Sequence, residues 1–154
     1  MKKIIYSLFF IILFLMSGCS KKDDLTIVSN ECGITLNNAT IKYTNDTHGG
    51  FHYDGCKQVI ILCDSDFDIE EISSNEHWHE LPLSDNINKF LYQPYSEQVN
   101  IPIIENGYFY FKDRFEDTRI TYNDNKLFDR QAFNFTVAIY DSDSNVLYYV
   151  KFDS

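Results

Sequence analysis

The sequence predicts an α+β domain in which an antiparallel sheet of about five strands packs against one or two short helices. Apolar and polar residues alternate over 133–139, which is typical of a half-buried strand. A turn at 141–145 and a second apolar segment at 146–152 complete the pattern of a hairpin. Ser84 precedes apolar residues at helical spacing, which predicts a capped helix. An all-β sandwich is the alternative architecture.

The first half of the chain contains three further strand signals. Residues 25–29 are expected to form a short edge strand, and residues 39–44 alternate in the way of a half-buried strand. The continuous apolar run within 57–63 is typical of a strand that is buried on both faces. Between the last two lies a polar, glycine-rich loop, 45–55, so the sequence predicts a hairpin here.

The middle of the chain is less regular. Residues 67–72 fit either a strand or a helix. The helix after Ser84 should end before Pro94, because proline cannot continue a helix. Residues 108–111 are expected as a strand, and the charged segment 112–130 as a long loop or a short helix. The Phe-rich face of the C-terminal hairpin should supply much of the core, at roughly 1.5–3 kcal/mol for each fully buried ring.

The N-terminus has the pattern of an export signal. Lys2 and Lys3 precede an apolar stretch, 4–16, which is too short to span a bilayer. The following Ser17-Gly18-Cys19 resembles the lipobox of bacterial lipoproteins. The resemblance implies that 1–18 is a signal peptide and that Cys19 carries the acyl chains, palmitate among them.

This resemblance also implies a location and a layout. Residues 19–30 would be the lipidated N-terminus and tether, and 31–154 a single globular domain in the cell envelope. The protein would be held on the cell membrane or the outer membrane, facing the periplasm or the cell exterior, because two or three acyl chains anchor a protein stably. Residues 21–24 also resemble the surface-export signal of lipoproteins in the Bacteroidota.

The composition narrows the range of partners. The chain has 13 Lys and Arg against 23 Asp and Glu, a formal net charge of −10, and removal of 1–18 makes it more negative. Such a surface repels nucleic acids, which are therefore excluded as partners. It favours a basic protein or a cation.

Three cysteines remain after lipidation, in a compartment that permits disulfides. Cys56 and Cys63 would lie about 20 Å apart along one strand, too far for a disulfide. In the predicted hairpin, Cys63 lies near the start of the preceding strand, within reach of Cys32. A Cys32–Cys63 disulfide is therefore expected, and three free thiols are the alternative.

The loop 45–55 and a second segment contain all the histidines of the chain. Glycines let this loop fold tightly and gather its side chains. No cofactor is expected, but imidazole and carboxylate groups suit zinc or copper as an alternative. The candidate ligands are Asp46, His48, His52, Asp54, His77 and His79. Cys56, which ends the same segment beside His52 and Asp54, is the candidate nucleophile of a thiol enzyme.

Two other kinds of site are conceivable. Aspartates at 64, 66 and 68 and at 141 and 143 resemble the start of a calcium loop, although neither segment has the glycine and glutamate of an EF-hand. An exposed aromatic platform could bind sugar or protein. Its candidate residues are Trp78, Tyr92, Tyr95, Tyr108 and Tyr110.

The domain also resembles small, uncharacterised bacterial lipoproteins. The shared segments are the loop 46–52 with Asp54-Gly55, and the ending 133–136 with Tyr148-Tyr149. This resemblance implies no activity, and the sequence lacks the motifs of serine hydrolases and nucleotide-binding enzymes. The leading hypothesis is a non-enzymatic binding module, one form of which is an acidic inhibitor or immunity protein against a basic enzyme. The alternative is a metal-binding or thiol enzyme that uses the loop 46–56.

Overall fold

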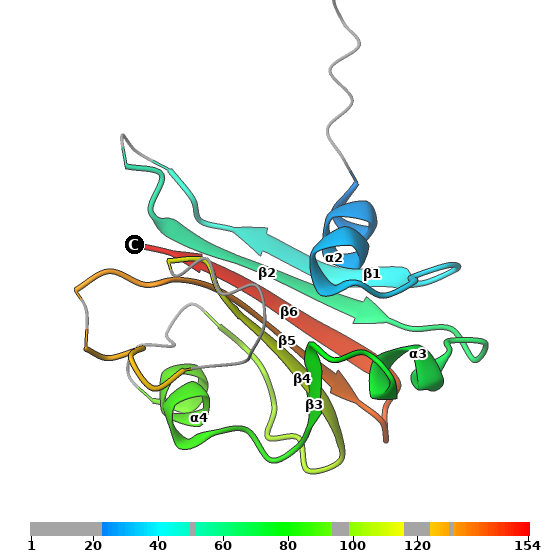
Figure 1. The fold of residues 1–154 in the computed structure, drawn as a ribbon. Helices are drawn as coiled ribbons and strands as arrows, with labels where there is room; N and C mark the ends of the chain where they lie inside the picture. Colours follow the sequence, from blue (N-terminus) through cyan, green and yellow to red (C-terminus); the bar gives the residue numbers. More distant parts are fainter. Residues whose placement is uncertain (1–22, 50–51, 94–98, 116–123, 130) are drawn as a thin grey trace, which may run out of the picture.

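The computed structural model of the chain describes residues 23–49, 52–93, 99–115, 124–129 and 131–154. The strands of this part form one antiparallel sheet of six strands in the order β1-β2-β6-β5-β4-β3 (Figure 1). The expected antiparallel sheet is confirmed with one strand more than expected, and the described residues show no second sheet of a sandwich. The predicted signal peptide, 1–18, and Cys19 lie outside the described residues. No described helix is long and apolar enough to cross a bilayer.

Two hairpins make up most of the sheet, both as predicted. The first joins β1 (Thr40–Asp46) to β2 (Gly55–Leu62), and the C-terminal hairpin joins β5 (Asn134–Asp141) to β6 (Val146–Asp153). β2 pairs with β6, so the two hairpins lie side by side. The predicted strand at 108–111 is the centre of β4 (Gly107–Asp113), which pairs with β5.

The two edges of the sheet are irregular. β1 has a bulge between Ile41 and Tyr43, where its pairing with β2 shifts by one residue. At the opposite edge lies β3 (Trp78–Glu80), which has three residues and which the sequence did not predict as a strand. Its neighbour β4 is rich in aromatic residues, and Trp78 pairs with Tyr110 across the two strands.

Segment 25–29 is a helix, so the expected edge strand was wrong. Asp23 accepts a hydrogen bond from the backbone N–H of Leu25, and Gly33 ends the helix in the left-handed conformation. These two caps select the helix α2 (Asp24–Cys32) over a strand. Because Val28 is fully buried against the sheet, the packed part of the chain begins before the expected boundary at residue 31.

The other two helices also begin at side-chain caps. Asp68 caps α3 (Ile69–Ser73), which resolves the ambiguity of segment 67–72 in favour of a helix. Ser84 caps α4 (Asp85–Tyr92) by accepting from the backbone N–H of Ile87, as the sequence predicts.

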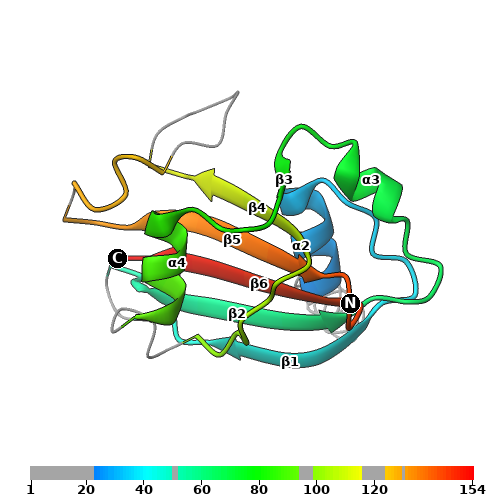
Figure 2. The same ribbon diagram turned by 90° about the horizontal axis from the view of Figure 1, so that it is seen from below.

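Helices cover both faces of the sheet (Figures 1 and 2). On the α2 face, residues of α2 and α3 pack with Val59, Leu147 and Tyr149. On the α4 face, α4 packs with the phenylalanines of the terminal hairpin, which confirms the predicted Phe-rich core. The α4 side chains involved are Ile87, Phe90 and Leu91.

The expected Cys32–Cys63 disulfide is not formed. β1 and β2 pair as predicted, with Thr40 opposite Leu62, so Cys63 does lie beside the start of β1. Cys32, however, is the last residue of α2, and its carbonyl accepts a hydrogen bond from the indole of Trp78. The three cysteines of the described part are free and buried.

Candidate functional site

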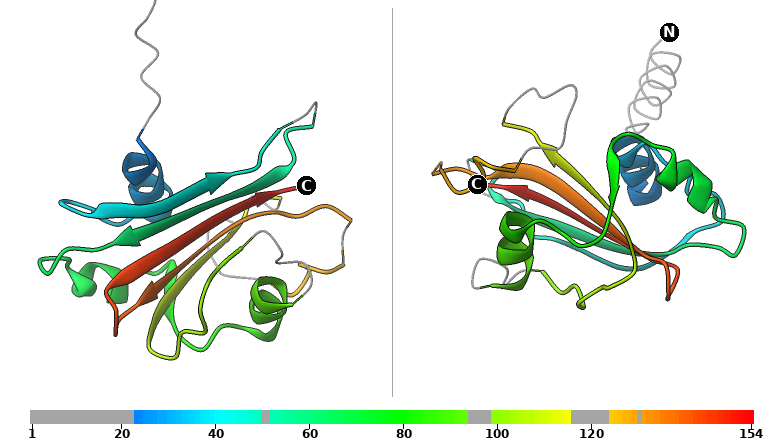
Figure 3. Two further views of the ribbon diagram at one scale, coloured as in Figure 1. Left: turned by 180° about the vertical axis from the view of Figure 1, so that it is seen from behind. Right: turned by 60° about the horizontal axis from the view of Figure 1, so that its bottom comes forward.

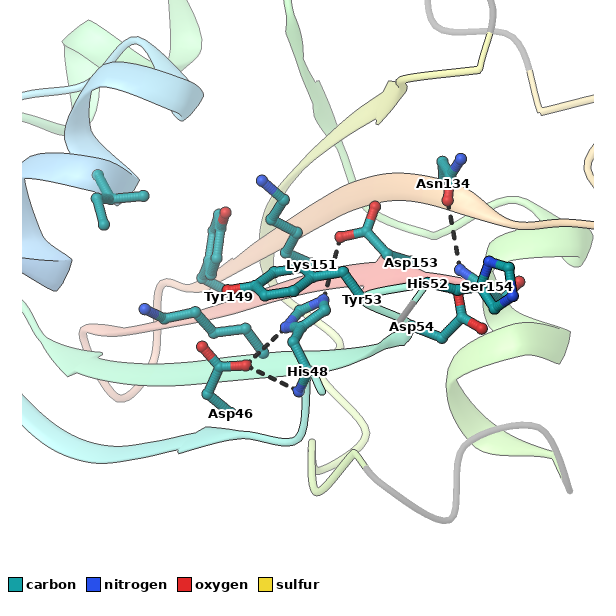
Figure 4. A pocket seen from close by; sticks show the side chains of 12 residues that line it. Asp46, His48, His52, Tyr53, Asp54, Asn134, Tyr149, Lys151, Asp153 and Ser154 are labelled. Atoms are coloured by element: carbon teal, nitrogen blue, oxygen red, sulfur yellow. Dashed lines mark hydrogen bonds and ion pairs between the residues drawn. The ribbon is translucent and has the colours of Figure 1, made fainter. Parts of the chain in front are cut away.

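A hollow of about 460 Å³ opens on the α2 face of the sheet, beside the helix itself, since Ile27 of α2 is part of its lining (Figure 4). Here β2 begins and β6 ends, at the end of the sheet that carries the C-terminus (Figure 3), and His48 of the β1–β2 loop reaches Asp153 on β6. Apart from one aliphatic side chain, Ile27, its lining is polar or aromatic. The lining includes Asp46, His48, Tyr53, Asp54, Lys151 and Asp153.

Backbone contacts fix the loop at its base. The N–H of Thr47 donates to the carbonyl of Cys56 at 2.9 Å, and the N–H of Cys56 donates to the Thr47 hydroxyl at 2.9 Å. Gly55 lies so close to His48 that a Cβ on it would be 2.5 Å from the His48 backbone. The sequence therefore needs glycine at this position for the loop to close.

His48 fastens the loop to the sheet. Its side chain is 5% exposed, with Nδ1 2.6 Å from the carboxylate of Asp46 and Nε2 3.1 Å from that of Asp153 on β6. Neutral imidazole has a single N–H, so both contacts can be donated at once only when the ring is protonated. Asp153 is held in turn by Arg114 at 2.7 Å.

Tyr53 is presented at the mouth of the hollow. Its ring stacks on that of His48 with centroids 5.4 Å apart and an interplanar angle of 17°, yet the residue is 67% exposed. Its backbone has a positive φ of 59°, which is uncommon for a residue with a side chain and costs energy. One ring face is thus supported by a clamped imidazole, and the other faces solvent.

One of the two lysines of the hollow has an ammonium group that no described residue neutralises. Lys57 and Lys151 lie directly opposite each other on β2 and β6, an arrangement of like charges that costs stability. Lys57 is paired with Asp24 of α2 at 2.5 Å. Within the part of the chain that the structure describes, the ammonium group of Lys151 has neither an ion pair nor a hydrogen bond.

The fold brings four of the six candidate metal ligands to one hollow and places the other two elsewhere. Asp46, His48, His52 and Asp54 line the hollow beside β1 and β2, but His79 is on β3, at the other edge of the sheet, and His77 directly precedes that strand. Five strand spacings of about 4.8 Å place the two edges roughly 24 Å apart. The described residues contain no group of three or more His, Cys, Asp or Glu that could hold a metal ion.

Cys56 does not line the hollow either. It packs on the α4 face, because neighbouring residues of a strand point to opposite faces, and the hollow lies on the α2 face. Burial, with the nearby charges of Asp46 and Asp153, raises the pKa of the Cys56 thiol to about 11. A protonated, buried thiol is a poor nucleophile.

We expect all three thiols of residues 20–154 to resist alkylation by iodoacetamide at about pH 8 in the folded protein. Cys32, Cys56 and Cys63 are at most 3% exposed, and burial raises the pKa of each. Mass spectrometry should find each thiol modified only after the protein is unfolded in urea. Rapid modification of any of them in the native state would contradict this burial.

The aromatic platform is not formed by the residues that the sequence suggested. Trp78 and Tyr110 are core residues, and the Tyr92 hydroxyl donates to the carbonyl of Pro102. Tyr108 is partly buried against the α2-face core, and Tyr95 lies outside the described residues. The exposed aromatic residue of the described lining is Tyr53, which sequence reasoning missed although it stands between His52 and Asp54 in the singled-out loop.

The calcium-like segments have other roles. Asp68 caps α3, and Asp141 accepts hydrogen bonds from Asp143 and Ser144 within the β5–β6 turn. These carboxylates serve local backbone structure.

The Asp46 carboxyl links the site to pH. Partial burial raises its pKa, but hydrogen bonds from the ring and backbone of His48 outweigh this and lower the pKa below the ordinary 3.8. The ionised carboxylate therefore stabilises the fold at pH values above the pKa that Asp46 has in the unfolded chain. This contribution is lost as the pH falls through the lower pKa of Asp46 in the folded protein.

We accordingly expect the urea midpoint of the wild-type protein to fall on acidification below about pH 4. Asp46→Asn should be less stable than wild type at neutral pH and should show a shallower acid decline. Urea titrations at a series of pH values would measure both, and Asp54→Asn is the matched control in the same loop. Parallel acid declines of wild type and Asp46→Asn would contradict this role.

No protein-family model, curated protein or solved structure matches the chain. The fold of the described residues is a single open antiparallel sheet with a few short helices and a polar hollow at one end. The resemblance of the N-terminus to bacterial lipoproteins stays a prediction.

Proposed function

We propose that the protein is a non-enzymatic binding module of the bacterial cell envelope, anchored through Cys19, and that the hollow is its binding site. The observation that carries this proposal is the presentation of Tyr53: an exposed ring held in place by a buried, doubly bound imidazole. Ordering a ligand-binding side chain before binding lowers the entropy cost of association. Exposed aromatic residues on a fixed loop are typical of recognition sites.

The chemistry of the hollow supports binding over catalysis. Both ring nitrogens of His48 contact carboxylates, so neither is available as a general base in this arrangement. The only cysteine of the loop points to the other face of the sheet. The thiol-enzyme alternative would need Cys56, which packs on the other face, and a metal site that included His77 or His79 would need groups from opposite edges of the sheet.

To test this proposal, residues 20–154 are immobilised and exposed to envelope extract from the producing bacterium. The wild-type protein should retain a component, protein or glycan, that Tyr53→Ala does not retain. Tyr43→Ala is the control, since Tyr43 is 46% exposed on β1 and lies outside the hollow. Retention that is the same for wild type and Tyr53→Ala would refute the hollow as the binding site.

His48→Gln tests how the platform works. The amide of glutamine carries its donors on a single nitrogen and cannot span the two carboxylates that the two ring nitrogens of His48 contact, so Tyr53 loses its rigid support. We expect retention by this variant to be weaker than by wild type but stronger than by Tyr53→Ala, with urea unfolding as the check on folding.

An acidic inhibitor of a basic enzyme is a second form of the proposal. Acidic side chains gather around α3, at the end of the sheet opposite the hollow, and include Asp66, Asp68, Glu70 and Glu71. They suit electrostatic steering towards a basic partner. Inhibition of a basic envelope muramidase that weakens with added salt and with Asp66→Asn/Glu70→Gln would support this form, and salt-insensitive inhibition would count against it.

A further inference from the structure

We infer that the hollow binds a negatively charged saccharide, with a sugar ring stacked on the free face of Tyr53 and its acidic group paired with Lys151. This inference rests on the proposed function and names the ligand class of the same site. Three features of the hollow carry it: the supported aromatic face, the unneutralised lysine and the polar lining.

The aromatic face suits a sugar ring. A pyranose presents a flat row of C–H groups, which carry a slight positive charge and pack on the negative face of an aromatic ring. Tyr53 has one face against His48 and is 67% exposed, so its other face is free for such a contact. The same hollow contains Asp54 and Ser154, whose oxygens can meet sugar hydroxyls (Figure 4).

The charge of the ligand follows from Lys151. Lys57 is neutralised by Asp24, and the two ring nitrogens of His48 contact Asp46 and Asp153. Lys151 faces Lys57 across the strands without a carboxylate of its own in the described residues, in a chain with a net charge of −10. A carboxylate or sulfate on the ligand would remove this uncompensated charge and form a charge-assisted hydrogen bond.

Two other classes of ligand, nucleic acids and apolar peptides, fit the hollow less well. A nucleic acid would place a dense row of phosphates against a strongly acidic protein that offers one unpaired ammonium group in the hollow. An apolar peptide side chain would need an apolar wall, but among the described residues of the lining Ile27 is the only aliphatic one. A saccharide with scattered acidic groups avoids both problems, because its charges are sparse and its hydroxyl groups suit a polar lining.

The test measures binding to residues 20–154 by isothermal titration calorimetry with three probes: trigalacturonic acid, a heparin-derived tetrasaccharide and neutral cellotriose. We expect at least one of the acidic probes to bind more tightly than cellotriose. Binding of trigalacturonic acid alone identifies carboxylate as the recognised group, and binding of the heparin fragment alone identifies sulfate. Equal affinity for acidic and neutral probes would overturn the role of Lys151.

Matched variants connect this binding to the hollow. Lys151→Gln should raise the Kd for the acidic probe about tenfold, as expected for one hydrogen bond to a charged group, and leave cellotriose unaffected. Lys112→Gln, at an exposed position of β4 outside the hollow, should leave the Kd unchanged. Tyr53→Ala should weaken binding by a similar factor, and Tyr43→Ala should not. Equal losses in the variants and their controls would overturn the assignment.

Failure of this inference is distinguishable from failure of the proposed function. If neither acidic probe binds while the immobilised protein still retains an envelope component through Tyr53, the saccharide class is wrong and the binding module stands. If both experiments fail, the hollow is not a binding site. Urea unfolding of each variant confirms that it is folded under the conditions of the titration.

Discussion

Replacing Gly107 with alanine should destabilise the protein by roughly 3 kcal/mol or more, because a methyl group has no room at this position. Gly107 begins β4 opposite Asp141, with φ at +145°, a conformation that side chains rarely adopt. A Cβ there would be 1.9 Å from the carbonyl oxygen of Tyr140. The obstacle is backbone, so β4 and β5 would have to separate where they meet the β5–β6 turn.

Urea unfolding followed by the fluorescence of Trp78, the single tryptophan, measures this effect. Trp78 is 6% exposed, so its fluorescence emission should shift strongly when unfolding exposes it to water. Gly49→Ala is the matched control, because the nearest atom to its Cβ would be the Thr47 oxygen at an ordinary 3.9 Å. A Gly107→Ala protein as stable as Gly49→Ala would show that the two strands do not approach as described.

Phe90→Ala should cost about 3–5 kcal/mol, the range for removing a large aromatic side chain from a core. Phe90 is 1% exposed and connects α4 to the sheet. Its ring meets those of Phe135 and Phe152 edge-on, with centroids 4.6 and 5.1 Å away. Edge-to-face contacts of this kind add to the effect of burial.

The loss should appear as a lower urea midpoint, with β-sheet circular dichroism retained before the transition. Ile103→Ala is the control, since this side chain is 82% exposed and its removal should change the stability by no more than about 0.5 kcal/mol. If Phe90→Ala were equally mild, α4 would not be a fixed part of the core.

The hairpins were predictable because their signals are local. Residues 133–139 alternate cleanly, the turn at 141–145 is polar, and the return strand is apolar, so neighbouring residues determine the pairing. Segment 25–29 was misread because its apolar residues fit a strand as well as a helix. The deciding residues are the caps Asp23 and Gly33, which flank the segment.

The site was predictable only in part. The glycine-rich loop was correctly singled out, but proximity in sequence suggested that His48 would join the other histidines. Its partners are instead Asp46, two residues away, and Asp153, next to the end of the chain. That second contact depends on β2 pairing with β6, which no local pattern encodes. The same pairing creates the opposition of Lys57 and Lys151.

The irregular edges of the sheet have a consequence for the protein at high concentration. An open sheet invites further strands wherever an edge is long and flat. Here the bulge between Ile41 and Tyr43 interrupts the β1 edge and places Lys42 at the interruption. At the opposite edge, β3 leaves only three residues. Copies that meet at high concentration therefore present edges that resist strand addition, which protects the protein from forming fibrils.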